Sequence, residues 1–307
     1  MPDHNIHHQA GPTVYVIILT FNKWELTRAC IASLIRQDYS DYHIIVVDNG
    51  SMDRTVENVH QQFPEVTVIA NEANLGFAAG SNVGIQTALE NKADFILMLN
   101  NDTVVPQNLL RVLVQHAQSL PDVGILTPRI FHYDNPESLW FAGSRRHWLL
   151  LEAVDFGPVE ARRYVKPDEL HTLDYIFGTV MLVPAEVFKK VGLFDESFFL
   201  YYEDMDFCLR VQSAGYKLYY IPDIGVQHHI SSSTSSMPAM RYYHKARGSV
   251  IFFRKHANGV RLPFIIPYRL GSMLGTLIRL GRKRKWRVIQ AYLLGLWHGL
   301  KVRLQLL

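Results

Sequence analysis

The stretch VYVIILTFNKWELTRACIASLIRQDYSDYHIIVVD, residues 14–48, decides the fold of this chain. It contains two short runs rich in Val and Ile, at 14–19 and 44–47, separated by a segment whose apolar residues recur at helical spacing. Short apolar runs are typical of parallel strands buried on both faces, and the segment between them suits a helix packed on the sheet. Runs at 66–69 and 95–99 continue the alternation. The sequence therefore predicts an α/β fold with a Rossmann-like, mostly parallel central sheet flanked by helices.

The composition is that of a folded protein of one or two domains. The chain has 307 residues, of which 48% are apolar, so a disordered or fibrous protein is excluded. Its two cysteines, Cys30 and Cys208, cannot build a disulfide framework, and we expect a reducing cytosolic setting. Residues 1–12 are polar and rich in His, which predicts a flexible N-terminus and no signal peptide.

Charge divides the chain into two unlike parts. Fifteen of the 31 Lys and Arg residues lie in residues 241–307, which contain no Asp or Glu, so residues 1–240 carry a net charge of −12. The apolar runs of this tail are shorter than the ~20 residues that a membrane span requires. We therefore expect 241–307 to be a basic, amphipathic helical region that associates with a membrane surface. The alternatives are a solvated basic helix packed on its own domain and nucleic-acid binding.

Polar residues follow each of the four predicted strands, where open α/β sheets bind their ligands. The chain has no G-x-G-x-x-G after its first strand and no P-loop motif, so a dinucleotide-binding domain and a P-loop NTPase are unsupported. The carboxylate of Asp48 can accept a hydrogen bond from a pyrimidine N–H or a ribose hydroxyl, or it can simply open a D-N-G-S turn. The residues expected at this ligand site are Thr20, Asn22, Asp48, Asn49, Ser51, Asn74, Gly76, Phe77, Gly80, Asn82, Asn100 and Asn101.

Two oxygen ligands for a metal ion are expected in the stretch LMLNNDT, residues 97–103. If the segment is extended, Asn100 and Asp102 point to the same side, because side chains alternate with period two. Mg²⁺ or Mn²⁺ accepts so sparse a site, since waters and substrate phosphates complete its shell. The stretch VQHHISSST, residues 226–234, follows a predicted strand, 217–221, and a His there can complete a metal shell or contact a phosphate.

A second acidic cluster lies in FDESFFLYYEDMDFCLR, residues 194–210, which mixes five carboxylates with aromatic residues. A helix is expected to begin near Glu203, Asp204 and Asp206, and compensation of the helix dipole is the plain interpretation of Glu203 or Asp206. The alternative is that the aromatic surround and the neighbouring carboxylates raise one pKa and create a general base for a hydroxyl nucleophile.

Taken together, these motifs resemble the family 2 glycosyltransferases, inverting enzymes of the GT-A fold, and especially their rhamnosyltransferase-like branch. The resemblance covers about residues 13–256 and implies a catalytic domain at 13–240, with a nucleotide-binding half at 13–128 and an acceptor and catalytic half at 129–240. The motifs that carry it, in family order, are VIILTFN, IIVVDNGSMDRT, NEANLGFAAGSNVGI, LMLNNDT, GTVMLVPAEVFKKVGLFDESFFLYYEDMDFCLR and HHISSS.

The resemblance also implies roles for individual residues. Asp48 matches the carboxylate that reads the nucleobase, and Asn100 with Asp102 takes the place of the D-x-D metal motif, which leaves Asp102 as its only anionic ligand. His228 or His229 matches the third metal ligand, and we favour His228. The remaining matches are Asp204 as catalytic base with Glu203 beside it, and Gly178, Thr179, Tyr202 and Asp206 on the acceptor side.

The implied activity is inverting transfer of a sugar from a nucleoside-diphosphate donor to a hydroxyl of a glycan or lipid-linked saccharide. dTDP-rhamnose is the favoured donor, a UDP-sugar is next, and Mg²⁺ or Mn²⁺ is the implied cofactor. Such an enzyme works in cell-surface polysaccharide synthesis, in the cytoplasm and peripherally at the inner face of the cell membrane, without a nucleic-acid partner. The alternative is a non-catalytic nucleotide-sugar or glycan-binding module, which would keep Asp48 but could dispense with Asp204.

Overall fold

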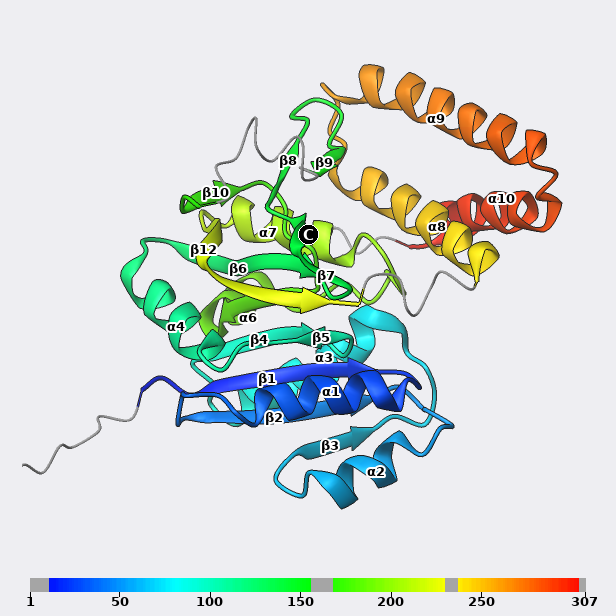
Figure 1. The fold of residues 1–307 in the computed structure, drawn as a ribbon. Coiled ribbons are helices and arrows are strands. Elements are labelled where there is room, and N and C mark those ends of the chain that lie inside the picture. The colour runs from blue at the N-terminus through cyan, green and yellow to red at the C-terminus, as the bar shows by residue number, and fades with distance from the viewer. Residues whose placement is uncertain (1–10, 156–167, 230–236, 304–307) are drawn as a thin grey trace, which may run out of the picture.

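A mixed sheet flanked by helices forms the body of the molecule (Figure 1), in a computed structural model that describes residues 11–155, 168–229 and 237–303. Most of the predicted flexible N-terminus, and residues 230–233 of the HHISSS motif, lie outside the described residues. The strands are β1 (Val14–Thr20), β2 (Tyr42–Asp48), β3 (Thr67–Ala70), β4 (Phe95–Asn100), β5 (Thr103–Val104), β6 (Val123–His132), β7 (Asn135–Phe141), β8 (Ser144–Arg146), β9 (Ala153–Asp155), β10 (His171–Leu173), β11 (Val180–Pro184) and β12 (Lys217–His228). The helices are α1 (Trp24–Leu34), α2 (Thr55–Gln62), α3 (Gly76–Glu90), α4 (Leu109–Ser119), α6 (Ala185–Val191), α7 (Glu203–Ser213), α8 (Pro238–His256), α9 (Leu262–Arg282) and α10 (Trp286–Lys301).

The first four predicted strands are confirmed as β1 to β4, and they pair in parallel in the order β3-β2-β1-β4. Residues Val16, Ile17 and Ile18 of β1 are completely buried, as expected of a strand covered on both faces. The predicted α/β class is therefore correct, and its parallel character is strongest in this half of the sheet.

The second half of the sheet reverses direction at β11. This strand is antiparallel to β4 on one side and to β6 on the other, whereas β12 runs parallel to β6. The last strand is also longer than the predicted 217–221, because it continues past a register shift to His228. As a result, the carboxyl ends of β1, β2, β4 and β12 and the amino end of β11 lie along one edge of the sheet.

Three helices follow the sheet in the basic tail. Helix α10 packs along α8, and α9 lies on the outer side of this pair (Figure 1). A small apolar cluster that includes Phe198, Ile251, Phe252 and Ile265 joins α8 and α9 to the loop before α7. Within the described ranges, none of the helices has the length and apolar character needed to cross a membrane.

Candidate active site

Backbone and side-chain hydrogen bonds hold the loops after β1, β2 and β4 together. The carbonyl of Thr20 accepts from the N–H of Asn49 at 2.8 Å, and the Thr20 hydroxyl accepts from the amide of Asn101 at 3.2 Å. The amide of Asn49 donates to the carbonyl of Gly76 at 2.9 Å. Asn49 and Asn101 were expected to contact a ligand, and the structure instead shows both amides engaged in holding these loops.

Asp48 ends β2 and uses only part of its hydrogen-bonding capacity. One carboxylate oxygen accepts from the N–H of Ser51 at 2.8 Å, and the hydroxyl of Ser51 in turn accepts from the N–H of Asn22 at 2.6 Å. The other oxygen is buried and has no hydrogen-bond partner among the described residues. Asp48 therefore shapes the turn and still presents one acceptor to a ligand, so the two interpretations of this residue are compatible.

The glycine-rich motif brings the start of α3 against the loop that precedes α7. Gly76 has a φ of +83°, and a Cβ there would overlap the carbonyl oxygen of Phe199. The side chain of Asn74 accepts from the N–H of Gly76 at 2.9 Å, and Phe77 donates its own N–H to Phe199 at 2.6 Å. At Gly80 a Cβ would lie 2.7 Å from the amide nitrogen of Asn49. These glycines allow parts of the protein to approach one another.

Asn82 links the same helix to the acidic loop. Its amide donates to the carbonyl of Phe194 at 2.9 Å and to Glu196 at 3.0 Å, and its oxygen accepts from the N–H of Phe194 at 3.0 Å. All of its donor and acceptor groups therefore have protein partners, which makes it a residue that holds the loop.

Asp102 and His228 come together through the pairing of β5 with β12. His228 stands opposite Thr103 in this pairing, and the carbonyl of Asp102 accepts from the N–H of His229 at 2.9 Å. The Nε2 atom of His228 then lies 3.1 Å from a carboxylate oxygen of Asp102, and both side chains are buried. The segment around Asp102 is a turn between β4 and β5, so the expected extended conformation is wrong.

The donor atoms of this pair suit a divalent cation. Two ligands at adjacent corners of an octahedral Mg²⁺ shell lie about 3 Å apart, close to the separation of these two atoms. Among the described residues no group of three or more His, Cys, Asp and Glu side chains converges, so the remaining ligands would be the Asn100 amide, substrate oxygens and water. The Nδ1 atom of His228 has no hydrogen-bond partner in the described part, and the ring packs on Trp140, with centroids 5.0 Å apart.

His229 faces another way. Its ring stacks on Tyr133 with centroids 3.5 Å apart. Of the two histidines that the sequence offered, His228 is the one that faces Asp102.

Asp204 stands at the start of α7 and is connected to the Asn100–Asp102 turn. One of its oxygens accepts from the N–H of Gly178 at 3.1 Å, and the adjacent residue, Thr179, accepts through its carbonyl from the N–H of Asn100 at 3.0 Å. Burial raises the pKa of Asp204, although hydrogen bonds from the hydroxyl of Tyr175 and from Gly178 oppose the shift. A carboxylate with a raised pKa is a better proton acceptor.

Glu203 differs from its neighbour. It is buried, and one of its oxygens has no hydrogen-bond partner among the described residues. Burial first, and the charge of Asp204 second, raise the pKa of Glu203 well above its ordinary value. In this pair of carboxyl groups Glu203 therefore favours the neutral form.

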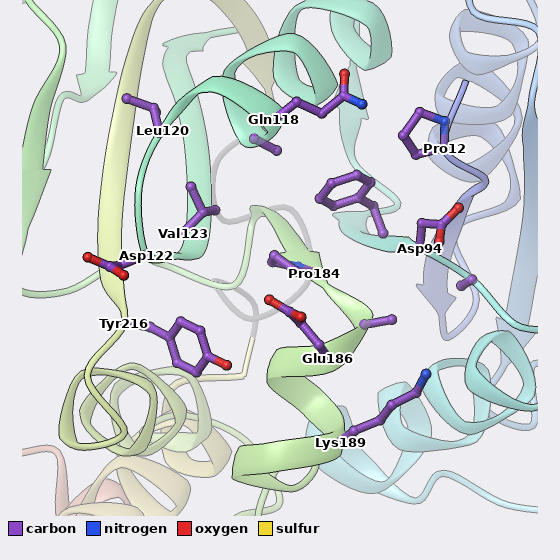
Figure 2. Close-up of a pocket in the computed structure, with 14 residues that line it drawn as sticks. Pro12, Asp94, Gln118, Leu120, Asp122, Val123, Pro184, Glu186, Lys189 and Tyr216 are labelled. Atoms are coloured by element: carbon purple, nitrogen blue, oxygen red, sulfur yellow. The ribbon is translucent and has the colours of Figure 1, made fainter. Parts of the chain in front are cut away.

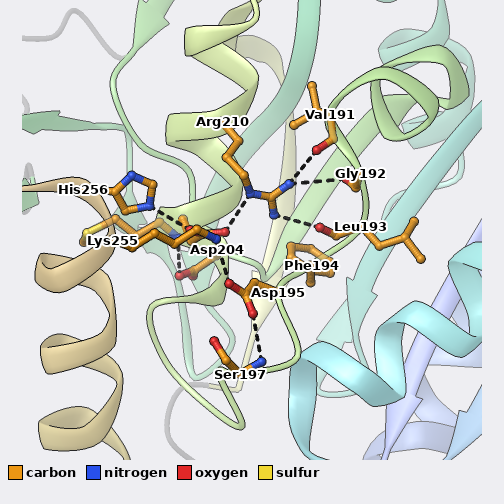
Figure 3. A network of polar contacts seen from close by, with 12 residues as sticks. Val191, Gly192, Leu193, Phe194, Asp195, Ser197, Asp204, Arg210, Lys255 and His256 are labelled. Carbon is orange, nitrogen blue, oxygen red and sulfur yellow. Dashed lines mark hydrogen bonds and ion pairs between the residues drawn. The ribbon is translucent and has the colours of Figure 1, made fainter. Parts of the chain in front are cut away.

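Asp206, expected on the acceptor side, is instead buried inside an ion network. Figure 3 labels the other members of this network, Arg210, Lys255 and His256. Its carboxylate lies 2.8 Å from Arg210, 2.8 Å from Lys255 and 2.7 Å from His256. Burial alone would raise the pKa of Asp206, but the hydrogen bond from His256 and the charges of Arg210 and Lys255 outweigh it and lower the pKa to about 2. Such a group is a poor base at neutral pH.

The sequence reasoning missed an aromatic series between His228 and Asp204. Trp140 lies next to His228, its ring centroid is 5.5 Å from that of Phe177, and Phe177 is 4.9 Å from Tyr175, which hydrogen-bonds Asp204. Trp140 and Phe177 are only partly buried. The signal was present in the aromatic residues of LWFAG, 139–143, and of DYIFGT, 174–179, which includes Gly178.

A cavity of about 610 Å³ lies away from these residues (Figure 2). Its lining includes Phe95 at the start of β4, Val123 at the start of β6 and Pro184 at the end of β11. These positions belong to the opposite edge of the sheet, so this cavity is separate from the candidate active site.

Comparison with known proteins finds relatives that match most of the chain. The N-acetylglucosaminyl-diphospho-decaprenol L-rhamnosyltransferase of Mycobacterium tuberculosis is 25% identical over 302 residues, which cover 90% of this chain and 97% of that protein. The dTDP-rhamnosyl transferase RfbF of Shigella flexneri is 24% identical over 300 residues, covering 94% of this chain and 95% of its own. The crystal structure of GalNAc-T7 with UDP, GalNAc and Mn²⁺ matches 82% of this chain and 49% of its own, with a TM-score of 0.64 and 18% identity, which shows the shared GT-A fold.

The family model of glycosyl transferase family 2 matches residues 15–191. This segment contains β1 to β4, the Asn100–Asp102 turn and β11. Because the match spans more than half of the chain and the relatives above are rhamnosyltransferases, the protein belongs to glycosyl transferase family 2, in its rhamnosyltransferase-like branch.

Proposed function

We propose that this glycosyltransferase moves rhamnose from dTDP-rhamnose, or as the second choice a sugar from a UDP donor, to a hydroxyl of a glycan or lipid-linked saccharide with inversion. The observation that carries the proposal is the link from Asp204 through Gly178 and Thr179 to Asn100, beside the Asp102–His228 pair. A candidate proton acceptor that is linked in this way to candidate cation ligands favours an enzyme over a non-catalytic nucleotide-sugar or glycan-binding module.

Asp204 acts in this proposal as the general base. Its carboxylate takes the proton of the acceptor hydroxyl while the hydroxyl oxygen forms a bond to the anomeric carbon, and the bond from that carbon to the donor phosphate breaks. The electron pair of the broken bond leaves with the nucleoside diphosphate. One displacement inverts the anomeric carbon without a covalent enzyme intermediate.

Asp102 and His228, with the amide of Asn100, would hold the divalent cation. A bound Mg²⁺ or Mn²⁺ supplies positive charge to the departing diphosphate. The structure of GalNAc-T7 contains Mn²⁺ with UDP, which supports a cation of this kind. Trp140 and Phe177, between the cation residues and Asp204, offer apolar ring faces to a sugar.

The proposal is tested by a donor screen that measures release of nucleoside diphosphate, with and without Mn²⁺ or Mg²⁺, in the presence of a lipid-linked saccharide acceptor. We expect the largest acceptor-dependent release with dTDP-rhamnose, and only when a divalent cation is present. Absence of acceptor-dependent release with every dTDP- and UDP-sugar would contradict the proposed function.

The unused oxygen of Asp48 predicts a choice of nucleobase. Thymine and uracil carry a ring N–H that can donate a hydrogen bond to this oxygen. The ring nitrogen of cytosine at the same position carries no hydrogen and is itself an acceptor. We expect Asp48→Ala to lower the affinity for dTDP or UDP by about 10- to 100-fold, the usual value of a hydrogen bond to a charged group. Calorimetric titration measures this change. The affinity for CDP serves as the control, and an equal loss for CDP and UDP would contradict base reading by Asp48.

We further propose that α9 and α10 attach the enzyme peripherally to the inner face of the membrane. On α9 the side chains of Ile266, Leu270 and Leu274 are 53%, 56% and 58% exposed and lie four residues apart, on one face of the helix. Helix α10 also carries exposed apolar residues, namely Trp286, Leu293, Leu294 and Trp297. The tail around them has no acidic residue, which suits an anionic lipid surface.

We expect a triple variant, Ile266→Gln with Leu270→Gln and Leu274→Gln, to lose most of its sedimentation with vesicles of phosphatidylglycerol and phosphatidylcholine, because these apolar side chains would insert beside the headgroups. We expect the parent to bind these vesicles less strongly at high salt, because salt screens surface charges over ~8 Å. It should keep some binding, because its apolar side chains still insert. A matched control is Met52→Gln with Trp148→Gln, two exposed apolar residues outside the tail. Equal binding of parent and triple variant, or no binding of the parent at any salt, would contradict this attachment.

A further inference from the structure

The turn that carries Glu203 and Asp204 is an unusual piece of backbone. The two residues before them, Tyr201 and Tyr202, both have left-handed conformations, with φ of 69° and 76°. Such conformations are costly for residues other than Gly and persist only when the surroundings hold them in place. The contacts that fix this turn therefore help to determine where the Asp204 carboxylate lies.

Helix α8 holds the turn from one side. Gly248 allows close approach, since a Cβ there would lie 2.7 Å from the carbonyl oxygen of Tyr201 and 3.1 Å from the ring of Tyr202. One helical turn further on, Phe252 packs on the ring of Tyr202 with centroids 5.5 Å apart. The end of α8 then reaches α7 beyond the carboxylate pair, where Lys255 and His256 contact Asp206.

Helix α9 adds one charged contact through Arg269. Its guanidinium donates to Glu152 at 3.0 Å and to the hydroxyl of Ser249 at 2.7 Å, and it lies 4.7 Å over the ring of Phe253. Ser249 stands next to Gly248 in the sequence, and Phe253 next to Phe252, the two residues of α8 that contact the turn. One side chain of α9 thus joins this part of α8 to the loop before β9.

We propose that Arg269 is a positioning residue for the catalytic base: its hydrogen bond to Ser249 holds α8 against the turn that places the Asp204 carboxylate. The inference rests on the proposed role of Asp204. The proposal gives α9 a second role besides the proposed membrane attachment, because the helix with the exposed apolar face also supports the turn before Asp204. It also explains why a charged residue interrupts the apolar run of α9 on the side that faces the protein.

The test compares Arg269→Gln with Arg282→Gln in the full-length protein, using a soluble saccharide acceptor so that membrane attachment plays no part. Both variants remove one positive charge from α9, but Arg282 is exposed. A misplaced catalytic group can cost up to ~10²-fold in rate. We expect Arg269→Gln to lower kcat by about tenfold or more with an unchanged KM for the donor, Arg269→Lys to recover part of the loss, and Arg282→Gln to match the parent.

A double-mutant cycle identifies the route of the effect. If Arg269 acts through the hydroxyl of Ser249, then Arg269→Gln combined with Ser249→Ala should be no slower than the slower single variant. Additive losses, an unchanged kcat in Arg269→Gln, or a fall in kcat matched by a rise in donor KM would overturn the inference. An inactive parent protein, or full activity of Asp204→Asn, would instead overturn the proposed function.

Discussion

Replacing Asp204 by Asn is expected to lower kcat for sugar transfer by ~10²–10⁴-fold, the usual contribution of a general base. The amide keeps the shape of the side chain and can still accept from the N–H of Gly178, but it cannot take the proton of the acceptor hydroxyl. Affinity for the nucleoside diphosphate should stay within a few-fold of the parent, as measured by calorimetry alongside the rate of diphosphate release.

The matched control is Glu203→Gln, because the raised pKa of Glu203 means that an amide resembles the form this residue already favours. We expect its kcat to remain close to that of the parent. The reverse pattern, with near-normal turnover in Asp204→Asn and a large loss in Glu203→Gln, would transfer the role of base to Glu203.

Asp102→Ala is expected to weaken cation-dependent binding of the nucleoside diphosphate by ~10²-fold or more. Loss of a residue that only hydrogen-bonds a metal ligand lowers metal affinity or activity by ~10–100-fold. Asp102 is proposed as the only anionic ligand itself, so its loss should cost at least as much. Calorimetric titration with dTDP or UDP, with and without Mn²⁺, measures the change.

Asn100→Ala provides the comparison, because it removes a neutral oxygen two residues away and should cost less. If the parent binds the nucleoside diphosphate equally well with and without the cation, the proposed metal site is wrong. If Asn100→Ala costs more than Asp102→Ala, the amide is the main ligand.

The strands that are buried on both faces could be predicted from the sequence alone. Runs such as 14–19 and 44–47 contain mainly Val and Ile, so the pattern indicates both the strand and its covered faces. The start of α7 was also predictable, because the carboxylates of Glu203 and Asp204 stand in its first turn, where the helix dipole favours negative charge.

Partners far away in the sequence were not predictable from local pattern. Asn82 contacts residues about 112 positions ahead of it, and Asp206 contacts His256 across 50 positions, so the residues near each of them in the sequence do not indicate these partners. The conformation at Asp102 was misjudged for the same reason. The turn there is stabilised by pairing with β12, a strand whose extension to His228 depends on its neighbours.

The ion network of Asp206 has a consequence for which part of the chain can fold by itself. A fragment that stopped at the predicted boundary, residue 240, would keep Arg210 but lose Lys255 and His256, two of the three basic side chains that contact the carboxylate of Asp206 in the described structure. Breaking a buried ion pair by removing one partner costs about 3–5 kcal/mol, a large share of the 5–15 kcal/mol by which domains are stable. We infer that the autonomous folding unit reaches at least to His256, so that α8 belongs to the catalytic domain.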